Sequence, residues 1–262
     1  MTTVLAATEN GVATLTLNRP EQGNGIDMTL AEDLLQAANA VAHDPAVRCV
    51  VLTGAGRMFC VGGDIAGFAA AGEEAGPFLE ALADKLHEAV VVLSEMAKPL
   101  VCAINGPAAG AGLSLAAAGD IVIASEAAHF TAAYTAIGLT PDGGMSWTLP
   151  RLVGMRVAQE MILTNRRVSA AEAVTLGLVT RTVAPESLAS EAGALAARLA
   201  DAPTGALGAV RSLLRHGQTQ GLAAQLDLES RTIGMAGAGP EAREGVSAFL
   251  AKRKADFRTI SR

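Results

Sequence analysis

Aromatic side chains are scarce in this chain of 262 residues, where Phe, Trp and Tyr together account for 3% of the composition. Half of the residues are nevertheless hydrophobic and only 18% are charged, so a sizeable core can be buried. We expect that core to consist mainly of Ala, Val, Leu and Ile. The length suits one large domain, or a core with a smaller appendage.

An excess of positive charge is also missing, because the formal net charge is −6 at pH 7. Proteins that bind nucleic acids normally present a basic face to the phosphate backbone. The composition therefore argues against a nucleic-acid partner. It leaves small-molecule partners open, because a local patch can oppose the overall sign of the charge.

Cysteine is sparse and follows no pattern. Cys49, Cys60 and Cys102 are odd in number, have no CxxC spacing, and each lies among apolar residues. This favours buried free thiols over disulfides or metal ligands. We therefore expect no metal site, and a reducing cytoplasm fits the three thiols.

Signals for secretion or membrane insertion are weak. The first eleven residues contain no basic cluster and no long apolar run, so they do not resemble a signal peptide. Residues 99–119 carry no charge, which raises the possibility of a membrane helix, but Pro107 and several polar residues and glycines interrupt them. We expect a buried strand, turn and helix there, and no membrane segment.

Predicted strands and helices alternate along most of the chain. Short apolar or alternating runs predict strands over 12–18, 48–54, 99–106 and 120–125. Apolar residues at helical spacing, or a run of small residues, predict helices over 28–42, 77–97 and 110–118. Such alternation is typical of an α/β fold with a mostly parallel sheet.

The pattern changes after residue 185 and is almost wholly helical to the end of the chain. We therefore expect an α/β core over residues 1–195 and a helical C-terminal region over 196–262. Amphipathic helices at the end of a chain often pack on a neighbouring subunit, so this region is a candidate for oligomerisation.

Two glycine-rich loops each follow a predicted strand. GRMFCVGGD covers residues 56–64 and INGPAAGAG covers 104–112, and neither contains a Walker or dinucleotide-binding fingerprint. Glycines at such positions let backbone N–H groups point outward. The two loops could converge on one oxygen as an oxyanion hole, although each alone is more often a plain turn.

A third segment, GLTPDGG over residues 138–144, holds Asp142 between a proline and two glycines. These residue types are the ones that surface turns select. The same segment could also hold a catalytic carboxylate at the mouth of a pocket. The two interpretations are compatible, because a rigid turn can aim a side chain.

The order of these motifs closely resembles the crotonase, or enoyl-CoA hydratase/isomerase, family. The resemblance covers nearly the whole length and rests on five segments: LNRPEQGNG, GAGRMFCVGGD, INGPAAGAGLSLAAAGDIVIAS, GLTPDGG and EGVSAFLAKR. The second half looks most like the 1,2-epoxyphenylacetyl-CoA isomerase branch. The resemblance implies a spiral of ββα units, a helical trimerisation region, and a homotrimer or a dimer of trimers.

The resemblance also implies an acyl-CoA thioester as substrate, with coenzyme A arriving as part of it and no separate cofactor. The enolate oxygen would be bound by the backbone amides that align with Gly63 and Ala111. Phe249 and Lys252 match C-terminal residues that approach the nucleotide end of CoA, although a solvated helix face also explains Lys252. Residues expected beside the first amide, in the CoA site, are Cys60, Gly62, Asp64 and Ile65.

Hydratases of this family use two glutamates, which align here with Ser114 and Tyr134. Neither is a carboxylate, and a phenol with an ordinary pKa of about 10 is a poor base at neutral pH. Tyr134 could donate a hydrogen bond, act as an acid, or pack in the pocket wall. In the isomerase branch the acid/base is an aspartate, and Asp142 matches its position.

These assignments predict an acyl-CoA isomerase that shifts a double bond or rearranges an epoxide with one carboxylate. Two alternatives stay open: an enoyl-CoA hydratase with atypical catalytic residues, and a silent acyl-CoA-binding protein. Weaker candidates receive no catalytic role. Asp120 is expected to cap or hydrogen-bond locally. Met145 and Trp147 could line the acyl pocket, although core packing is the expected role. No histidine is assigned as a ligand or a base, which covers His43, His87, His129 and His216.

Overall fold

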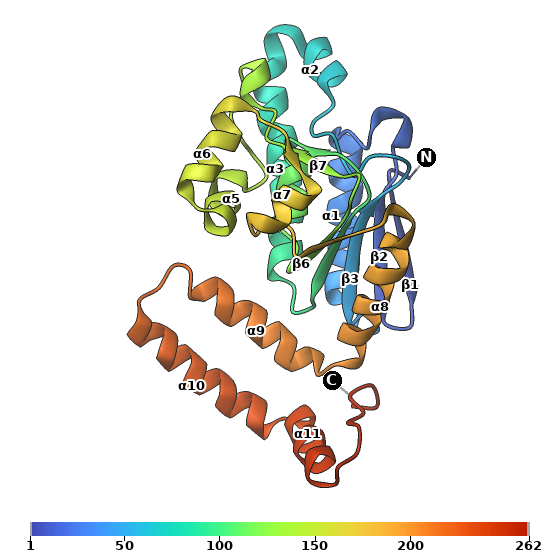
Figure 1. Cartoon of the computed structure of the whole chain (residues 1–262), viewed down its shortest axis with the longest axis vertical. Helices are drawn as coiled ribbons and strands as arrows, with labels where there is room; N and C mark the ends of the chain where they lie inside the picture. Colours follow the sequence, from blue (N-terminus) through green and yellow to red (C-terminus); the bar gives the residue numbers. More distant parts are fainter. Residues whose placement is uncertain (1, 261–262) are drawn as a thin grey trace.

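The computed structural model describes residues 2–260 and contains two mixed β-sheets surrounded by helices (Figure 1). The larger sheet has the strand order β1-β2-β3-β4-β6-β9, in which β1 is antiparallel to β2 and all other neighbours are parallel. Its strands are β1 (Val4–Glu9), β2 (Val12–Leu17), β3 (Cys49–Gly54), β4 (Leu100–Ile104), β6 (Ile121–Ser125) and β9 (Arg181–Val183). The predicted α/β fold with a mostly parallel sheet is confirmed.

The smaller sheet has the order β5-β7-β8, with one parallel and one antiparallel pair. Its strands are β5 (Ala108–Ala109), β7 (His129–Thr131) and β8 (Val168–Ser169). An isolated parallel bridge between Cys60 and Ala108 joins this sheet to the first glycine loop. The smaller sheet therefore brings together the two glycine loops that the sequence keeps far apart.

Both faces of the larger sheet are covered, which explains why β4 is wholly apolar and β3 is apolar apart from Thr53. Val50 and Leu52 belong to the main core beneath α1 (Met28–His43) and α3 (Ala75–Glu95). Cys49 and Val51 point the other way and pack with α8 (Leu188–Asp201). Because strand side chains alternate between faces, a strand buried on both faces needs a continuous apolar run.

Shorter helices connect the strands at the upper end of the sheet in Figure 1. In α4 (Ala111–Ala117) every residue is buried, which suits its small side chains. The charge-free run of residues 99–119 therefore forms a strand, a turn and a short helix, as predicted. The others are α2 (Ile65–Ala71), α5 (Met145–Val153), α6 (Met155–Thr164), α7 (Ala170–Thr175) and the 3-10 turns η1 (Pro20–Gln22), η2 (Gly72–Glu74), η3 (Thr135–Ile137) and η4 (Pro185–Ser187).

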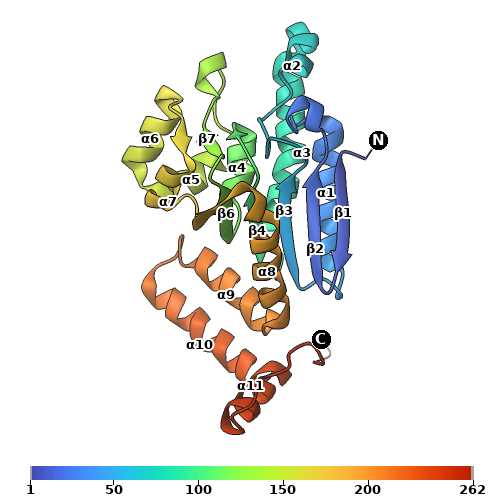
Figure 2. The same cartoon turned by 45° about the vertical axis from the view of Figure 1, so that its right-hand side comes forward.

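The C-terminal region is helical, as predicted, and extends away from the sheet in both views (Figures 1 and 2). It contains α9 (Thr204–His216), α10 (Leu222–Ala238) and α11 (Pro240–Leu250). Large apolar side chains on α10 and α11 face solvent, including Ile233, Met235 and Phe249. The predicted division at residue 195 falls inside α8, and an oligomerisation role for this region stays a prediction.

Cys49, Cys60 and Cys102 are buried free thiols, as predicted. Burial raises the pKa of Cys49 and of Cys60 to about 12. Among residues 2–260, no helix combines the length and the apolarity that crossing a bilayer requires. Within that same stretch, no three His, Cys, Asp or Glu side chains form a group that could hold a metal ion.

Candidate active site

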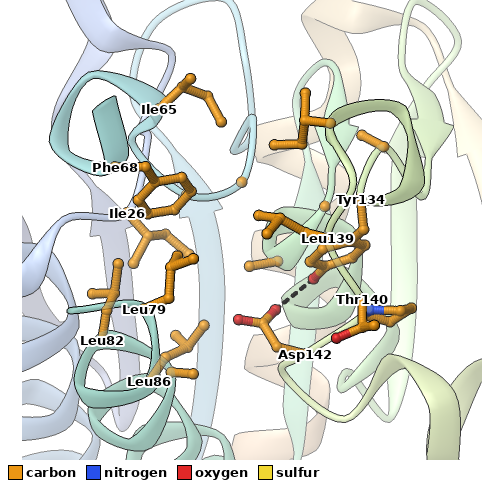
Figure 3. A pocket seen from close by; sticks show the side chains of 18 of the residues that line it. Ile26, Ile65, Phe68, Leu79, Leu82, Leu86, Tyr134, Leu139, Thr140 and Asp142 are labelled. Carbon is orange, nitrogen blue, oxygen red and sulfur yellow. Dashed lines mark hydrogen bonds between the residues drawn. The ribbon is translucent and has the colours of Figure 1, made fainter. Parts of the chain in front are cut away.

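A cavity of about 280 Å³ lies between α3 and the loops at the upper end of the sheet. One of its walls is apolar and includes Ile26, Phe68, Leu79, Leu82 and Leu86 (Figure 3). The facing wall includes Tyr134, Leu139, Thr140 and Asp142. Of the described residues that line this cavity, Glu80 and Asp142 are the acidic ones. The cavity is thus mostly apolar, with two acidic side chains in its lining, one of which is Asp142.

The first glycine loop pairs with the segment around Ile26, and the amide of Gly63 points away from that segment. Gly62 accepts a hydrogen bond through its carbonyl from the amide of Ile26 at 2.8 Å, and the amide of Asp64 donates to the carbonyl of Ile26 at 2.9 Å. In a parallel bridge these flanking groups face the partner, so the N–H of the residue between them faces the opposite side. The Gly63 amide therefore points away from Ile26, and Gly63 lines the cavity.

The second amide belongs to Ala111, the first residue of α4. Amides in the first turn of a helix have no acceptor within that helix. Gly62 lies beside this amide, because a Cβ built on Gly62 would be 3.5 Å from the Ala111 nitrogen. Gly62 itself has φ +100°, a conformation that favours glycine. The two predicted oxyanion donors, Gly63 and Ala111, therefore line one cavity on adjacent loops.

Cys60 ties these two loops together without reaching the cavity. Its amide donates to the carbonyl of Pro107 at 3.2 Å, and its carbonyl accepts from the amide of Ala109 at 2.9 Å. Gly112 passes so close that a Cβ there would lie 2.1 Å from the Cys60 carbonyl oxygen. The predicted contact of Cys60 with CoA stays a prediction, while its role in holding both loops is visible here.

Asp64 and Ile65 lie side by side with different contacts. Ile65 lines the cavity. Asp64 is the N-cap of α2, where its carboxylate accepts from the amide of Ala66 at 3.1 Å and pairs with Arg19 at 3.0 Å. The hydrogen bond from the Arg19 guanidinium lowers the pKa of Asp64 below its usual value. Asp64 thus anchors the helix whose first residue lines the cavity.

The segment that carries Asp142 is indeed a turn, and it leads into α5. Gly143 and Gly144 have φ +59° and +81°, and the amide of Met145 donates to the Asp142 carbonyl at 3.1 Å. The Asp142 carboxylate lies on the cavity wall, where Tyr134 donates its hydroxyl proton to Oδ1 at 2.5 Å (Figure 3). The segment is therefore a turn, as predicted, and it also places a carboxylate on the cavity wall, while a catalytic role for Asp142 stays a prediction.

Tyr134 is a hydrogen-bond donor in this arrangement and not a base. Its burial, together with the charge of the neighbouring Asp142, raises the pKa of the Tyr134 phenol far above its ordinary value. Ser114 donates its hydroxyl proton to the Asp142 main-chain carbonyl at 2.9 Å. The two positions that align with hydratase glutamates thus both contact Asp142.

Phe249 and Lys252 lie far from this cavity within one chain. Phe249 is an exposed residue of α11, and Lys252 is an exposed residue just after that helix. In Figure 1, α11 lies at the opposite end of the molecule from α2. Their predicted contact would then be with CoA that is bound to a neighbouring subunit. This contact stays a prediction.

Three contacts were not foreseen from the sequence. The amide of Gly143 donates to Nε2 of His87 at 3.0 Å. Asp120 bonds over a long range and not locally: it accepts from the Leu100 amide at 2.7 Å and pairs with Arg211 at 2.7 Å. No sequence spacing could reveal these contacts, because their partners are backbone groups or side chains on distant elements.

The prediction of core packing holds for Met145 and is wrong for Trp147. Met145 is buried, whereas the Trp147 side chain is 44% exposed. The Arg151 guanidinium covers the Trp147 ring at 4.2 Å, one helical turn further along α5. The correction follows from the helical period, which turns Trp147 away from the face that carries Met145.

A family model described as enoyl-CoA hydratase/isomerase matches residues 7–259. The 1,2-epoxyphenylacetyl-CoA isomerase of Escherichia coli (strain K12) is 41% identical over 97% of each chain. A "Probable enoyl-CoA hydratase" of Rhodobacter capsulatus is 40% identical over 94% of each. The crystal structure of an enoyl-CoA hydratase from Polaromonas sp. JS666 has a TM-score of 0.93 and 33% identity, and covers 97% of this chain and 98% of that one.

The chain therefore belongs to the enoyl-CoA hydratase/isomerase, or crotonase, family. Its two mixed sheets and helical C-terminal region are the crotonase fold. As a member of this family, it is an enzyme of acyl-CoA metabolism.

Proposed function

We propose that this enzyme is an acyl-CoA isomerase with a single carboxylate acid/base, Asp142. The observation that carries the proposal is the Asp142 carboxylate on the wall of an apolar cavity, held there by the Tyr134 hydroxyl. The two positions that align with the glutamates of hydratases hold Ser114 and Tyr134 instead. One carboxylate suffices to move a double bond, because the proton taken from one carbon can return to another.

The thioester carbonyl oxygen would accept hydrogen bonds from the amides of Gly63 and Ala111. Thioester α-protons are weakly acidic, so forming the enolate requires both a base and donors already aimed at the oxygen. One such donor typically contributes about 3 kcal/mol to the stability of the transition state. Both donors are backbone groups, so the side chain of Ala111 does not remove its donor.

Asp142, in its ionised form, would take a proton from C2 of a 3-enoyl thioester. The electron pair of the broken C–H bond moves onto the thioester as a dienolate. Protonated Asp142 then returns the proton to C4, which leaves a 2-enoyl thioester and regenerates the carboxylate. Rearrangement of a ring epoxide is the alternative reaction of the same site. Tyr134 stays protonated throughout and keeps the carboxylate in place.

The size and lining of the cavity support an apolar acyl group as the part of the substrate held inside. Its volume of about 280 Å³ lies at the lower end of the range for ligand sites. The acyl chain therefore fits there, with most of the CoA moiety outside. Apolar walls also disfavour a bound water, which hydration would require.

We further propose a homotrimer, or a dimer of trimers, built on the helices of residues 196–262. The exposed apolar side chains of α10 and α11 support this assembly, because large apolar patches on a surface are usually covered by a partner. Phe249 and Lys252 would then approach CoA bound to a neighbouring subunit.

Product analysis separates the isomerase from its rivals. The purified enzyme is incubated with a 3-enoyl-CoA and, separately, with a 2-enoyl-CoA, and the thioesters are resolved by chromatography. The isomerase converts the 3-enoyl thioester into the 2-enoyl thioester without adding water. Formation of a 3-hydroxyacyl thioester from the 2-enoyl substrate would favour an atypical hydratase. Binding of both thioesters, and of a phenylacetyl-CoA epoxide, without turnover would favour a silent binding protein.

A further inference from the structure

The peptide bond between Asp142 and Gly143 is held from both sides by side chains of two other helices. Ser114, on α4, donates its hydroxyl proton to the carbonyl of Asp142 at 2.9 Å. His87, on α3, accepts from the amide of Gly143 at 3.0 Å. We infer that Ser114 and His87 act as positioning residues that aim the catalytic carboxylate, an inference that rests on the proposed function of Asp142.

The geometry of the peptide group gives this pair of contacts its effect. The carbonyl and the N–H of one trans peptide point in opposite directions from a rigid plane. Contacts at both ends therefore fix the rotation of that plane, which sets ψ of Asp142 and φ of Gly143. Because Cα of Asp142 lies at one edge of this plane, the two contacts also restrict the direction of its Cα–Cβ bond.

The carboxylate itself is held by a third contact, from Tyr134 to Oδ1 at 2.5 Å. Three separate segments thus converge on one residue: α3, α4 and the segment before η3. An isolated turn of this composition would have considerable freedom, since glycine populates many backbone conformations. A displacement of about 1 Å at a reacting group can cost about 100-fold in rate.

Gly143 allows the approach that the serine contact needs. Its φ is +59°, and a Cβ on Gly143 would lie 2.8 Å from Cβ of Ser114. Any larger residue would push the turn away from α4 and lengthen the bond from Ser114 to the Asp142 carbonyl. The glycine at position 143 therefore supports the same positioning of Asp142 as the contacts from Ser114 and His87.

His87 acts on the turn and not on the substrate. The residue before it, Leu86, lines the cavity, while the His87 ring contacts the Gly143 amide beside it. To accept this bond the ring must carry its proton on Nδ1 and leave Nε2 free. A substitution of His87 that keeps a hydrogen-bond acceptor for the Gly143 amide should therefore preserve activity. A substitution of similar size that lacks an acceptor should lower it.

The test compares His87→Gln with His87→Leu in the full-length enzyme, using 3-enoyl-CoA isomerisation. Glutamine can accept from the Gly143 amide and leucine cannot, although both fill similar space. We expect His87→Leu to lower kcat about 10- to 100-fold with KM changed less than about threefold. His87→Gln should recover kcat to within about fivefold of the natural enzyme. Thermal unfolding of both variants checks that the fold is intact.

Ser114→Ala provides a second and independent arm. It removes the donor to the Asp142 carbonyl and should lower kcat as His87→Leu does, while calorimetry shows unchanged affinity for a non-reactive acyl-CoA thioether. The inference is overturned if His87→Leu keeps the natural kcat, if glutamine and leucine behave alike, or if binding falls as much as kcat.

Asp142→Asn separates this inference from the proposed function. If Asp142→Asn leaves isomerisation intact, the proposed function fails, and the positioning role fails with it. If Asp142→Asn abolishes isomerisation while His87→Leu and Ser114→Ala do not lower kcat, only the positioning role fails.

Discussion

The hydroxyl of Tyr134 donates to the carboxylate of Asp142 at 2.5 Å, across the wall of an apolar cavity (Figure 3). Burial and the adjacent carboxylate raise the pKa of the Tyr134 phenol, so this proton stays on the tyrosine over the whole working range of pH. The bond therefore has one direction, and it leaves Oδ2 as the oxygen that can face a substrate.

Tyr134→Phe should lower kcat about tenfold and leave KM nearly unchanged. The substitution keeps the aromatic ring and removes one hydrogen bond to a charged group, which is worth roughly 1.5–3 kcal/mol. Steady-state kinetics with 3-enoyl-CoA provide the measurement. An unchanged kcat would mean that Tyr134 only packs in the wall and that its hydroxyl does not position Asp142.

Gly112→Ala should disrupt the oxyanion loops. A Cβ on Gly112 would meet the Cys60 carbonyl oxygen at 2.1 Å, and that carbonyl is already bonded to the Ala109 amide. Because the obstacle is backbone, the loops must separate, and we expect a loss of about 1–3 kcal/mol of stability together with most of the activity. Chemical denaturation and kcat report the two effects.

Gly76→Ala is the matched control, since Gly76 is also helical and a Cβ there meets nothing within 4 Å. We expect it to raise stability by about 0.5–1 kcal/mol and to leave activity unchanged. Equal loss of stability in the two variants would contradict the close approach at Gly112.

The buried thiols should make the protein less stable at alkaline pH. Burial raises the pKa of Cys49 and Cys60 from an ordinary value of 9.0 to about 12, and it raises the pKa of Cys102 as well. Unfolded thiols lose their protons from about pH 9. Unfolding therefore releases protons between pH 9 and 12, and the free energy of unfolding falls as pH rises, by up to about 1.4 kcal/mol per unit for each thiol.

Urea unfolding between pH 7 and 11 measures this slope. Cys60→Ala should make the slope shallower above pH 9 and leave the pH dependence below pH 8 unchanged. If this variant has the natural slope, the alkaline loss of stability arises from other groups.

Phe249→Asp should weaken the assembly and, with it, the affinity for CoA thioesters. Phe249 is 82% exposed on α11, where the proposal puts a contact with a neighbouring subunit. Leu163→Asp, at a 71% exposed position of α6, is the control and should leave the trimer intact. Light scattering coupled to size-exclusion chromatography measures the mass of each. A natural protein that is monomeric at working concentration would contradict the proposed assembly.

The order of elements could be predicted because the patterns that encode it are local. The run from Arg48 to Gly54 and the charge-free stretch of residues 99–119 each contain the information that decides their structure. The same holds for Asp142, because the adjacent proline and glycines predict its turn. The features that could not be predicted depend on tertiary contacts. Nothing near His87 in the sequence indicates that it meets the Gly143 amide.

The central claim is that Asp142 is the acid/base. The most direct test compares the Asp142→Asn variant with the natural enzyme in the conversion of a 3-enoyl-CoA into the 2-enoyl-CoA. Asparagine keeps the size of the side chain and removes the basic oxygen. We predict a loss of at least about 1000-fold in kcat, within the range attributed to acid–base catalysis, with the affinity for a non-reactive acyl-CoA within about threefold. A variant that isomerises at a rate within about tenfold of the natural enzyme would contradict the assignment of Asp142 as the acid/base.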